Sequence, residues 1–188
     1  MRVLKYCLAL VMAAVLSAPE MPARRFAVST NLAGYANLGT MNAELSYSFS
    51  RRWTVNAGIK YNPWTFRASS PARQFQNRQQ AYAAGVRFWP WHVYSGWWIA
   101  GKLQYQEYNS GGMISRRTEE GDRVGAGLTA GYTYMLHRNL NIEFGIGLWA
   151  GMKWYTEYAC PACGMTLSSG RKGFILPNDL LISISYVF

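Results

Sequence analysis

Three sets of side chains could do chemistry in this chain. One set lies at isolated positions within runs of small or apolar residues and contains both signs of charge: Glu44, Lys60, Arg87, Lys102 and Glu143. A second set is basic and shares one connection that has no acid: Arg67, Arg73 and Arg78. The third is the pair Cys160 and Cys163. These residue types support ion pairing, bidentate binding of phosphate by arginine, and disulfide, metal or redox chemistry.

The cysteine pair favours a short disulfide over the other two chemistries. A structural zinc site takes four ligands, and no histidine lies near Cys160 and Cys163 to complete one. A thioredoxin-like site needs a helix N-terminus beside a βαβ pattern, which this part of the sequence does not show. We therefore predict a disulfide that tightens a loop, and neither a metal nor another cofactor.

Catalysis needs a nucleophile and a base within reach of each other. The chain has two histidines, His92 and His137, and both fall in short connections. No Ser-His-acid set, histidine cluster with metal spacing or glycine-rich phosphate loop can be assembled from the sequence. We predict that the protein is not an enzyme. A lipid A-modifying hydrolase or acyltransferase is the enzymatic alternative.

The sequence divides into a predicted signal peptide, 1–23, and one predicted barrel domain, 24–188. Arg2 and Lys5 precede ten apolar residues, 7–16, and small residues and prolines follow. This order is typical of a secretory signal, and ten residues are too short to span a bilayer as a helix. We therefore expect the remaining chain to fold outside the cytoplasm, where disulfides persist.

Strands must position these side chains, because alternation of apolar and other residues recurs eight times. The alternating runs cover 26–32, 41–49, 53–61, 82–88, 97–105, 124–134, 140–148 and 180–188. Long connections follow the third, fifth and seventh runs: 63–78, 109–122 and 152–177. Short turns on one side and long loops on the other are typical of outer-membrane barrels. The predicted fold is all-β, an eight-stranded antiparallel up-and-down transmembrane β-barrel.

Composition decides which face of these strands points inward. Charged residues make up 15% of the chain, against roughly 25–35% of a water-facing surface. The face opposite the apolar one carries mainly Thr, Asn, Ser and Gly, with the five isolated charges among them. Such a face suits the crowded lumen of an eight-stranded barrel. We therefore predict that the five charges form an ion-pair network in the lumen; a narrow polar path is the alternative.

Five short segments carry a resemblance to a known family. They are STNL (29–32), YNPW (61–64), RFWP (87–90), EYNSGG (107–112) and CPACG (160–164). In this order and spacing the chain resembles the domain of unknown function 3575 family of small outer-membrane β-barrel-like proteins. LPND, at 176–179, stands where a Gly-Pro-Thr-like turn is expected. This departure concerns the final loop more than the last strand. The resemblance implies a small outer-membrane barrel and no biochemical activity.

The expected location is the bacterial outer membrane, reached after secretion across the inner membrane. A net charge of +10 suits anionic partners. Expected partners are outer-membrane lipid including lipopolysaccharide, contacted by Arg67, Arg73 and Arg78; the barrel assembly machinery, which reads the terminal ISISYVF; and a surface or pilus-related protein, but no nucleic acid. The expected role is non-enzymatic, structural or in surface interaction, with the long outer loops as working surface. A secreted lipocalin-like binder of small ligands is a further alternative.

Overall fold

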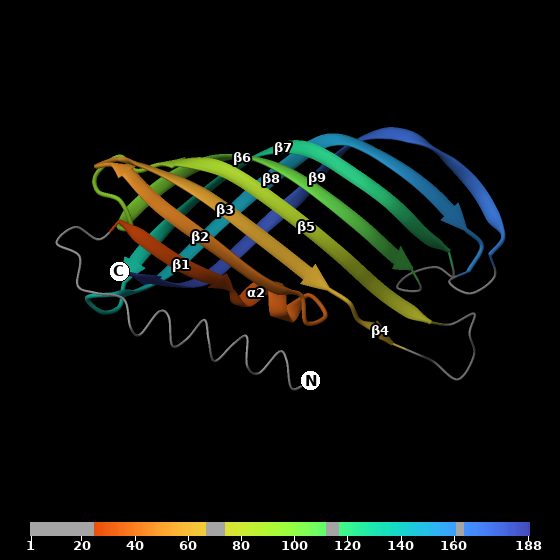
Figure 1. Cartoon of the computed structure of the whole chain (residues 1–188), viewed down its shortest axis with the longest axis horizontal. Coiled ribbons are helices and arrows are strands. Elements are labelled where there is room, and N and C mark those ends of the chain that lie inside the picture. Colours follow the sequence, from red (N-terminus) through yellow and green to blue (C-terminus); the bar gives the residue numbers. More distant parts are fainter. Residues whose placement is uncertain (1–24, 67–73, 112–116, 161–163) are drawn as a thin grey trace.

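The computed structural model describes residues 25–66, 74–111, 117–160 and 164–188. The predicted signal peptide lies outside the described residues, as do Arg67, Arg73 and Cys163. What is described is almost entirely β-structure (Figure 1). The prediction of an all-β antiparallel fold is therefore confirmed.

The strands form one antiparallel sheet. Their bounds are β1 Phe26–Asn31, β2 Met41–Ser50, β3 Trp53–Asn62, β4 Thr65–Phe66, β5 Phe75–Phe88, β6 Gly96–Gly111, β7 Thr118–Met135, β8 Leu140–Tyr158 and β9 Thr166–Val187, and a short helix, α2, spans Leu32–Ala36. The order within the sheet is β3-β2-β1-β9-β8-β7-β6-β5-β4, and β3 also pairs with β5. The long strands therefore pair in a ring, with β4 added at the edge of β5.

Two of the three connections expected to be long loops, 109–122 and 152–177, are largely strand within the described residues. β7, β8 and β9 are 18, 19 and 22 residues long, and the β7–β8 ladder continues to the pair Thr118 and Tyr158. The expectation of loops at 109–122 and 152–177 was therefore wrong for most of their residues. Polar residues and glycines dominate 118–122 and 168–173 and leave no clear apolar face there, so counting hydrophobic residues misses these parts of the strands. We call the part of β6–β9 beyond the level of Tyr105 the extension.

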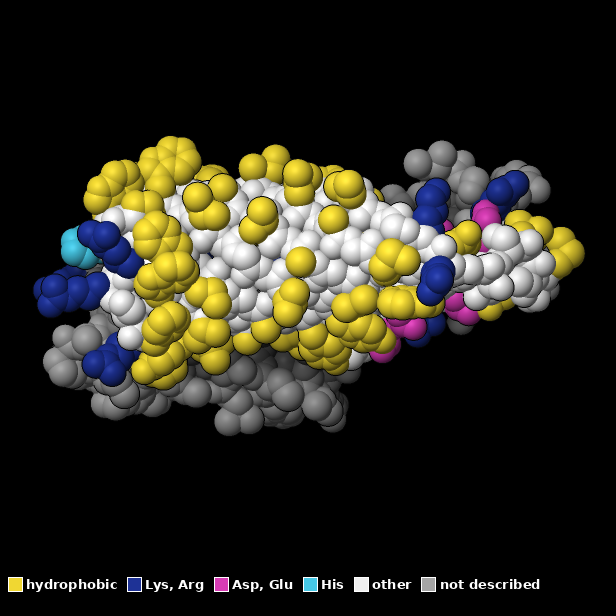
Figure 2. Space-filling view, turned by 90° about the horizontal axis from the view of Figure 1, so that it is seen from above, with side chains coloured by type: hydrophobic (Ala, Val, Ile, Leu, Met, Phe, Trp, Pro, Cys, Tyr) yellow, Lys and Arg dark blue, Asp and Glu magenta, His cyan; other side chains and the backbone are white. Residues whose placement is uncertain are grey.

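Apolar side chains face outward and polar side chains face inward along the closed part of the sheet. Neighbouring residues on β7 show the contrast, because Leu128 is 70% exposed and Thr129 is 4% exposed. In Figure 2 hydrophobic side chains cover the middle of the visible face, and charged ones gather at its two ends. No helix within the described residues is long and apolar enough to cross a membrane.

The small apolar core lies at the end of the sheet where the short turns, the start of β1 and the C-terminus lie (Figure 1). The turn between β5 and β6 brings Trp89 and Tyr94 inward beside Trp98, and all three are buried. The Trp89 indole donates to the Thr54 hydroxyl at 3.2 Å, and the Tyr94 hydroxyl donates to the Arg25 carbonyl at 2.9 Å. This turn therefore fills one end of the interior.

Glycines on β7 make room for the inward-facing tryptophans. A Cβ on Gly131 would lie 2.5 Å from the Trp98 ring, and one on Gly125 would lie 2.8 Å from the Trp149 indole nitrogen. Both distances are too short for a side chain, so the close approach requires glycine. The sequence shows these glycines as part of the small-residue face, but does not show what they accommodate.

β1 forms fewer backbone pairs than any other strand of the ring. It pairs with β2 at four positions and with β9 at five, and then gives way to α2. Two asparagine amides take the place of strand partners there. The Asn31 side chain donates to the Leu180 carbonyl at 3.0 Å and accepts from the Ile182 N–H at 3.1 Å. The Asn42 side chain bonds both the N–H and the carbonyl of Asn31, at 2.6 and 2.9 Å.

Candidate functional site

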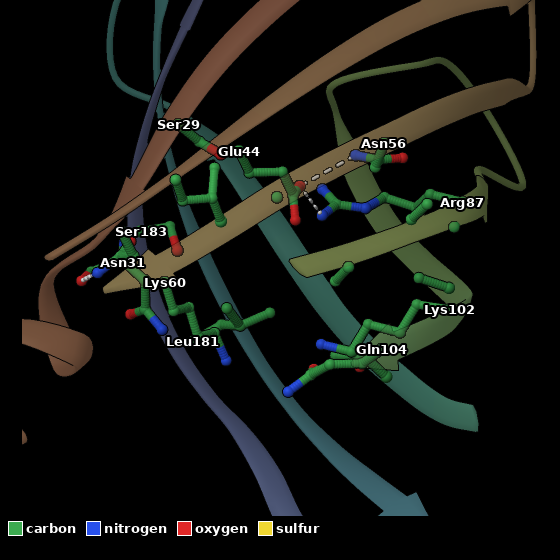
Figure 3. Close-up of a pocket in the computed structure, with 18 of the residues that line it drawn as sticks. Ser29, Asn31, Glu44, Asn56, Lys60, Arg87, Lys102, Gln104, Leu181 and Ser183 are labelled. Carbon is green, nitrogen blue, oxygen red and sulfur yellow. Dashed lines mark hydrogen bonds and ion pairs between the residues drawn. The ribbon is translucent and has the colours of Figure 1, made fainter. Parts of the chain in front are cut away.

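Three of the five predicted interior charges meet near the filled end, in what we call the Arg87 cluster: Arg87, Glu44 and Glu143. Arg87 Nη2 lies 2.8 Å from Glu44 Oε1, and Nη1 lies 2.8 Å from Glu143 Oε2. β5, β2 and β8 each supply one of these residues, because their inward faces look across the same interior. The Asn56 amide also donates to Glu44 Oε1 at 3.0 Å (Figure 3).

Burial makes the Arg87 cluster energetically demanding. The side chains of Arg87 and Glu143 are 6% and 4% exposed, and that of Glu44 is 36% exposed. The Arg87 guanidinium carbon lies 4.0 Å from the centre of the Trp98 ring and 5.5 Å from that of Trp89, so it also makes cation–π contacts. A buried charge is tolerated only when it is paired in this way. The tryptophans therefore seal the cluster on one side.

Lys60 and Lys102 face the same interior space as the Arg87 cluster. They line a cavity of about 80 Å³ together with Glu44, Arg87 and Gln104. In Figure 3 both lysines reach into this cavity from β3 and β6. The structure thus places all five predicted residues around one interior, and Arg87 forms ion pairs with Glu44 and Glu143 there. This arrangement can hold strands together by charge; it brings no nucleophile and base together.

A second group of interior charges, the Glu119 cluster, lies at the base of the extension: Tyr108, Glu119, Arg123 and Lys153. Lys153 Nζ lies 2.7 Å from both carboxylate oxygens of Glu119, and Arg123 Nη2 lies 3.6 Å from Oε1. The Tyr108 hydroxyl donates to the same Oε1 at 2.5 Å. The Arg123 guanidinium carbon lies 3.6 Å from the centre of the Tyr108 ring.

Sequence reasoning missed the Glu119 cluster because it assigned Glu119 and Lys153 to loops. The signal that could have found it is the alternation of β7 itself. Arg123 continues the inward set of Gly125, Gly127 and Thr129 by one more step. A strand can continue past its last apolar residue, and its side chains then keep alternating between the two faces.

The electrostatics of Glu119 follow from these contacts. Burial alone would raise the pKa of the Glu119 carboxyl. Hydrogen bonds from Lys153 and Tyr108, with the charges of Lys153 and Arg123, outweigh that effect and hold the pKa below its usual value. Glu119 is therefore ionised at neutral pH and neutralises part of the basic charge around it.

Of the other predicted site residues, the structure describes only Arg78 and Cys160. Arg78 is exposed and lies within β5, so its expected place in a loop was wrong. Its companions Arg67 and Arg73 lie outside the described residues. Cys160 is buried just after β8, and Cys163 lies outside the described residues, so the disulfide stays a prediction.

Chemistry by histidine or metal finds no geometric support in the described part of the chain. His92 and His137 are exposed in turns between strands. Among the described residues no group of three or more His, Cys, Asp or Glu side chains could hold a metal ion. The interior therefore offers two ion-pair clusters as its notable polar features.

Comparison with known proteins identifies a family and no closer relative. No curated protein and no solved structure matches the chain significantly. The family model described as "Protein of unknown function (DUF3575)" matches residues 7–188, which is nearly the whole chain. The expected resemblance is confirmed: this chain belongs to the domain of unknown function 3575 family.

Proposed function

We propose that the ring of strands is an eight-stranded transmembrane β-barrel of the bacterial outer membrane, with a non-enzymatic structural or surface-interaction role. The observation that carries this proposal is the inverted distribution of side chains. Large apolar residues such as Leu103, Leu128 and Ile146 are 68–70% exposed, while Gln104, Thr129 and Glu143 are buried. Water would disfavour so much exposed apolar surface, and lipid would favour it.

Two belts of outward aromatic residues support a membrane position. Phe49, Trp53, Trp97 and Tyr134 are exposed near the short turns, and Tyr61, Tyr82 and Tyr105 are exposed where the extension begins. Aromatic rings favour the two interfaces between lipid and water because they combine an apolar body with a polar edge. The apolar band between the belts is then the part that meets lipid.

The extension is the proposed working surface. It lies beyond the second aromatic belt and carries polar cross-strand contacts, such as Arg117 with Glu157 at 3.2 Å and Ser168 with Glu157 at 3.2 Å. A rigid hairpin stack presents side chains with less loss of conformational entropy than a loop does. Lipopolysaccharide and a surface or pilus-related protein are the partners proposed for it, and the barrel assembly machinery is the partner proposed during insertion.

Both alternatives fit these observations less well. A lipocalin-like binder keeps its apolar face inward, opposite to the exposures found here. A lipid-modifying enzyme of the outer leaflet needs a nucleophile and a base near the outer rim. His92 and His137 instead lie in turns at the filled end.

Paired arginine substitutions test the membrane position. Leu128 is 70% exposed midway between the two belts, and Leu136 is 55% exposed in the β7–β8 turn. Leu128→Arg should lower the free energy of unfolding in lipid vesicles by about 2–4 kcal/mol, and Leu136→Arg by about 1 kcal/mol or less. Both positions meet water in a soluble protein. Equal, small effects, or release of the protein by carbonate without detergent, would overturn the proposal.

A further inference from the structure

The last strand, β9, has a partner on only one side over much of its length. It pairs with β8 almost from end to end, but with β1 only from Ser183 to Val187. Beyond Ser183 no second strand of the described residues pairs with it. Every residue of 166–173 is exposed, whichever face it lies on, and Figure 1 shows this part of β9 at the outer edge of the extension. We call 166–173 the open edge.

Alternate residues of the open edge turn their backbone groups away from β8. In an antiparallel ladder each residue turns its N–H and its carbonyl toward the same neighbouring strand, and this direction alternates along the chain together with the side chains. Lower on β9, the outward-facing Ile182 donates its N–H toward β1, to the Asn31 side chain at 3.1 Å. Phe174 packs on the inward-facing Trp149, so Gly173 faces outward. Gly173 therefore turns its backbone groups to the same side as Ile182 does, where no strand of the described chain receives them.

The open edge is basic. Its charged residues are Arg171 and Lys172, and it contains no acid. The neighbouring strand does not offset them, because Lys153 lies opposite Lys172, and Glu157, farther along β8, pairs with Arg117 at 3.2 Å. Basic side chains on an edge disfavour pairing with a second copy of the same edge, since like charges would meet across the new ladder. The same charges favour a strand that carries acids.

We propose that the open edge binds an extended, acidic segment of a partner protein as an added strand. Backbone hydrogen bonds supply affinity in this mode of binding, and side chains at alternate positions supply specificity. Arg171 lies on the outward face and Lys172 on the inward face, so two neighbouring acids of the partner can each meet one cation. The inference deepens the proposed surface-interaction role and rests on it for the kind of partner. It does not depend on the membrane position.

Fluorescence anisotropy tests the proposal with the full-length protein refolded in a neutral detergent. The probe is a labelled peptide, TEEVTTVT, with both ends blocked. Antiparallel pairing along the open edge places its two glutamates opposite Lys172 and Arg171. The probe should bind, and its binding should weaken as the salt concentration rises. The lysine peptide TKKVTTVT should bind at least tenfold more weakly, and equal binding of the two peptides, or binding of neither, would overturn the proposal.

Substitution at Gly173 tests whether the backbone of the edge is what binds. Gly173→Pro removes one N–H from the open side and leaves the ladder with β8 in place. A Cβ on Gly173 would lie 3.8 Å from its nearest neighbour, the Gly151 carbonyl oxygen, so a side chain fits. Gly173→Pro should weaken binding of TEEVTTVT at least tenfold. Gly173→Ala is the matched control, because it keeps the N–H, and it should change binding less than twofold. Similar effects of the two variants would argue against an added strand.

A second variant removes charge and keeps the backbone. Arg171→Gln with Lys172→Gln should weaken binding of TEEVTTVT at least fivefold and remove most of its salt dependence. The circular dichroism spectrum should stay unchanged, since both side chains are exposed. Arg51→Gln with Arg52→Gln is the matched control, because these two exposed arginines are also neighbours but lie in the β2–β3 turn. It should change binding less than twofold, and equal losses in the two double variants would overturn the site.

Sedimentation of the wild-type protein in detergent tests the other occupant, a second copy of this chain. A dimer that Gly173→Pro abolishes, together with no binding of TEEVTTVT, would assign the open edge to self-association and overturn the acidic partner. The membrane position is tested separately by carbonate extraction. Peptide binding by a protein that carbonate releases would support the open edge and overturn the membrane position alone, so the two proposals can fail independently.

Discussion

The Arg87 and Glu119 clusters each join three charged side chains, with the two signs of charge in opposite proportions. At the filled end one guanidinium holds two carboxylates, at 2.8 Å each. At the open end one carboxylate holds two cations, at 2.7 and 3.6 Å. Tryptophan rings cover the first cluster, whereas the Glu119 side chain in the second is 29% exposed. The first arrangement is almost fully shielded from water, and the second is partly open to it.

Solvent access makes the two clusters differ in energy as well as in role. Charges removed from water depend almost wholly on one another, so loss of a partner leaves a stranded ion. Charges near the mouth keep water and dissolved ions as substitutes, and salt screens them. We therefore expect the Arg87 cluster to stabilise the fold strongly and the Glu119 cluster to stabilise it weakly.

Removal of the Arg87 guanidinium should give the largest effect. Arg87→Met strands Glu44 and Glu143 in the interior, and should lower the free energy of unfolding by roughly 3–5 kcal/mol. Combining it with Glu44→Gln and Glu143→Gln should restore part of this loss, because no charge is then stranded. Urea titrations in lipid vesicles measure both effects.

Arg78→Met is the matched control, since Arg78 lies on the same strand, β5, but is exposed. It should change stability by about 0.5 kcal/mol or less. If Arg87→Met proved no more costly than Arg78→Met, the comparison between a closed and an open cluster would fail. Strictly additive losses in the triple variant would show that the three side chains do not depend on one another.

Substitution at the open cluster should have a smaller effect that depends on pH. Glu119→Gln should lower the free energy of unfolding by about 1 kcal/mol at pH 7, because the carboxylate is partly exposed. The pKa of Glu119 is lowered in the folded protein from its usual value of 4.5. Its stabilisation is therefore complete above that usual value and is lost as the pH falls through the folded pKa. Unfolding titrations at several pH values measure the difference between wild type and variant.

This difference should shrink steadily below pH 4.5 and should depend on salt. Glu107→Gln is a suitable control, because Glu107 belongs to the same extension but faces outward and is exposed. A difference between wild type and Glu119→Gln that stayed constant down to pH 3 would contradict the assignment of the effect to the Glu119 carboxylate.

The two clusters also mark what the sequence could and could not predict. Strand alternation predicted that Glu44, Arg87 and Glu143 face one interior, because each lies in a run with an unmistakable apolar face. It could not predict which charges touch, since that depends on register and on where the ring closes. The turn holding Trp89 and Tyr94 was interpreted as a plain connection because inward packing of a turn leaves no periodic signal.

The extension was missed for a different physical reason. Beyond the band of exposed apolar residues a strand needs no apolar side when both of its faces meet polar surroundings. Lys153 and Glu119 therefore read as loop residues, although the backbone ladder runs on without a break through both positions. Hydrogen bonding between backbones, which sequence patterns do not record, decides where β7 and β8 end.

Substitution of the cysteines should have the smallest effect on the fold, because Cys160 follows the end of β8 that is farther from both clusters. The backbone N–H of Ala159 donates to the Met165 carbonyl at 3.0 Å, so a hydrogen bond already closes the hairpin around Cys160. A ring as short as Cys160 to Cys163 also restricts the unfolded chain less than a long one does. Cys160→Ser with Cys163→Ser should therefore change the free energy of barrel unfolding by about 0.5 kcal/mol or less.

Local measurements should nonetheless detect the disulfide. Proteolysis at the loop tip should be faster in the double serine variant, while the rest of the chain stays protected. The unreduced wild-type protein should be two hydrogens lighter by mass spectrometry than the reduced protein. Quantitative alkylation of both thiols in protein purified without reductant would rule the disulfide out. A large loss of stability would instead mean that the extension and the closed part of the sheet unfold together as one cooperative unit.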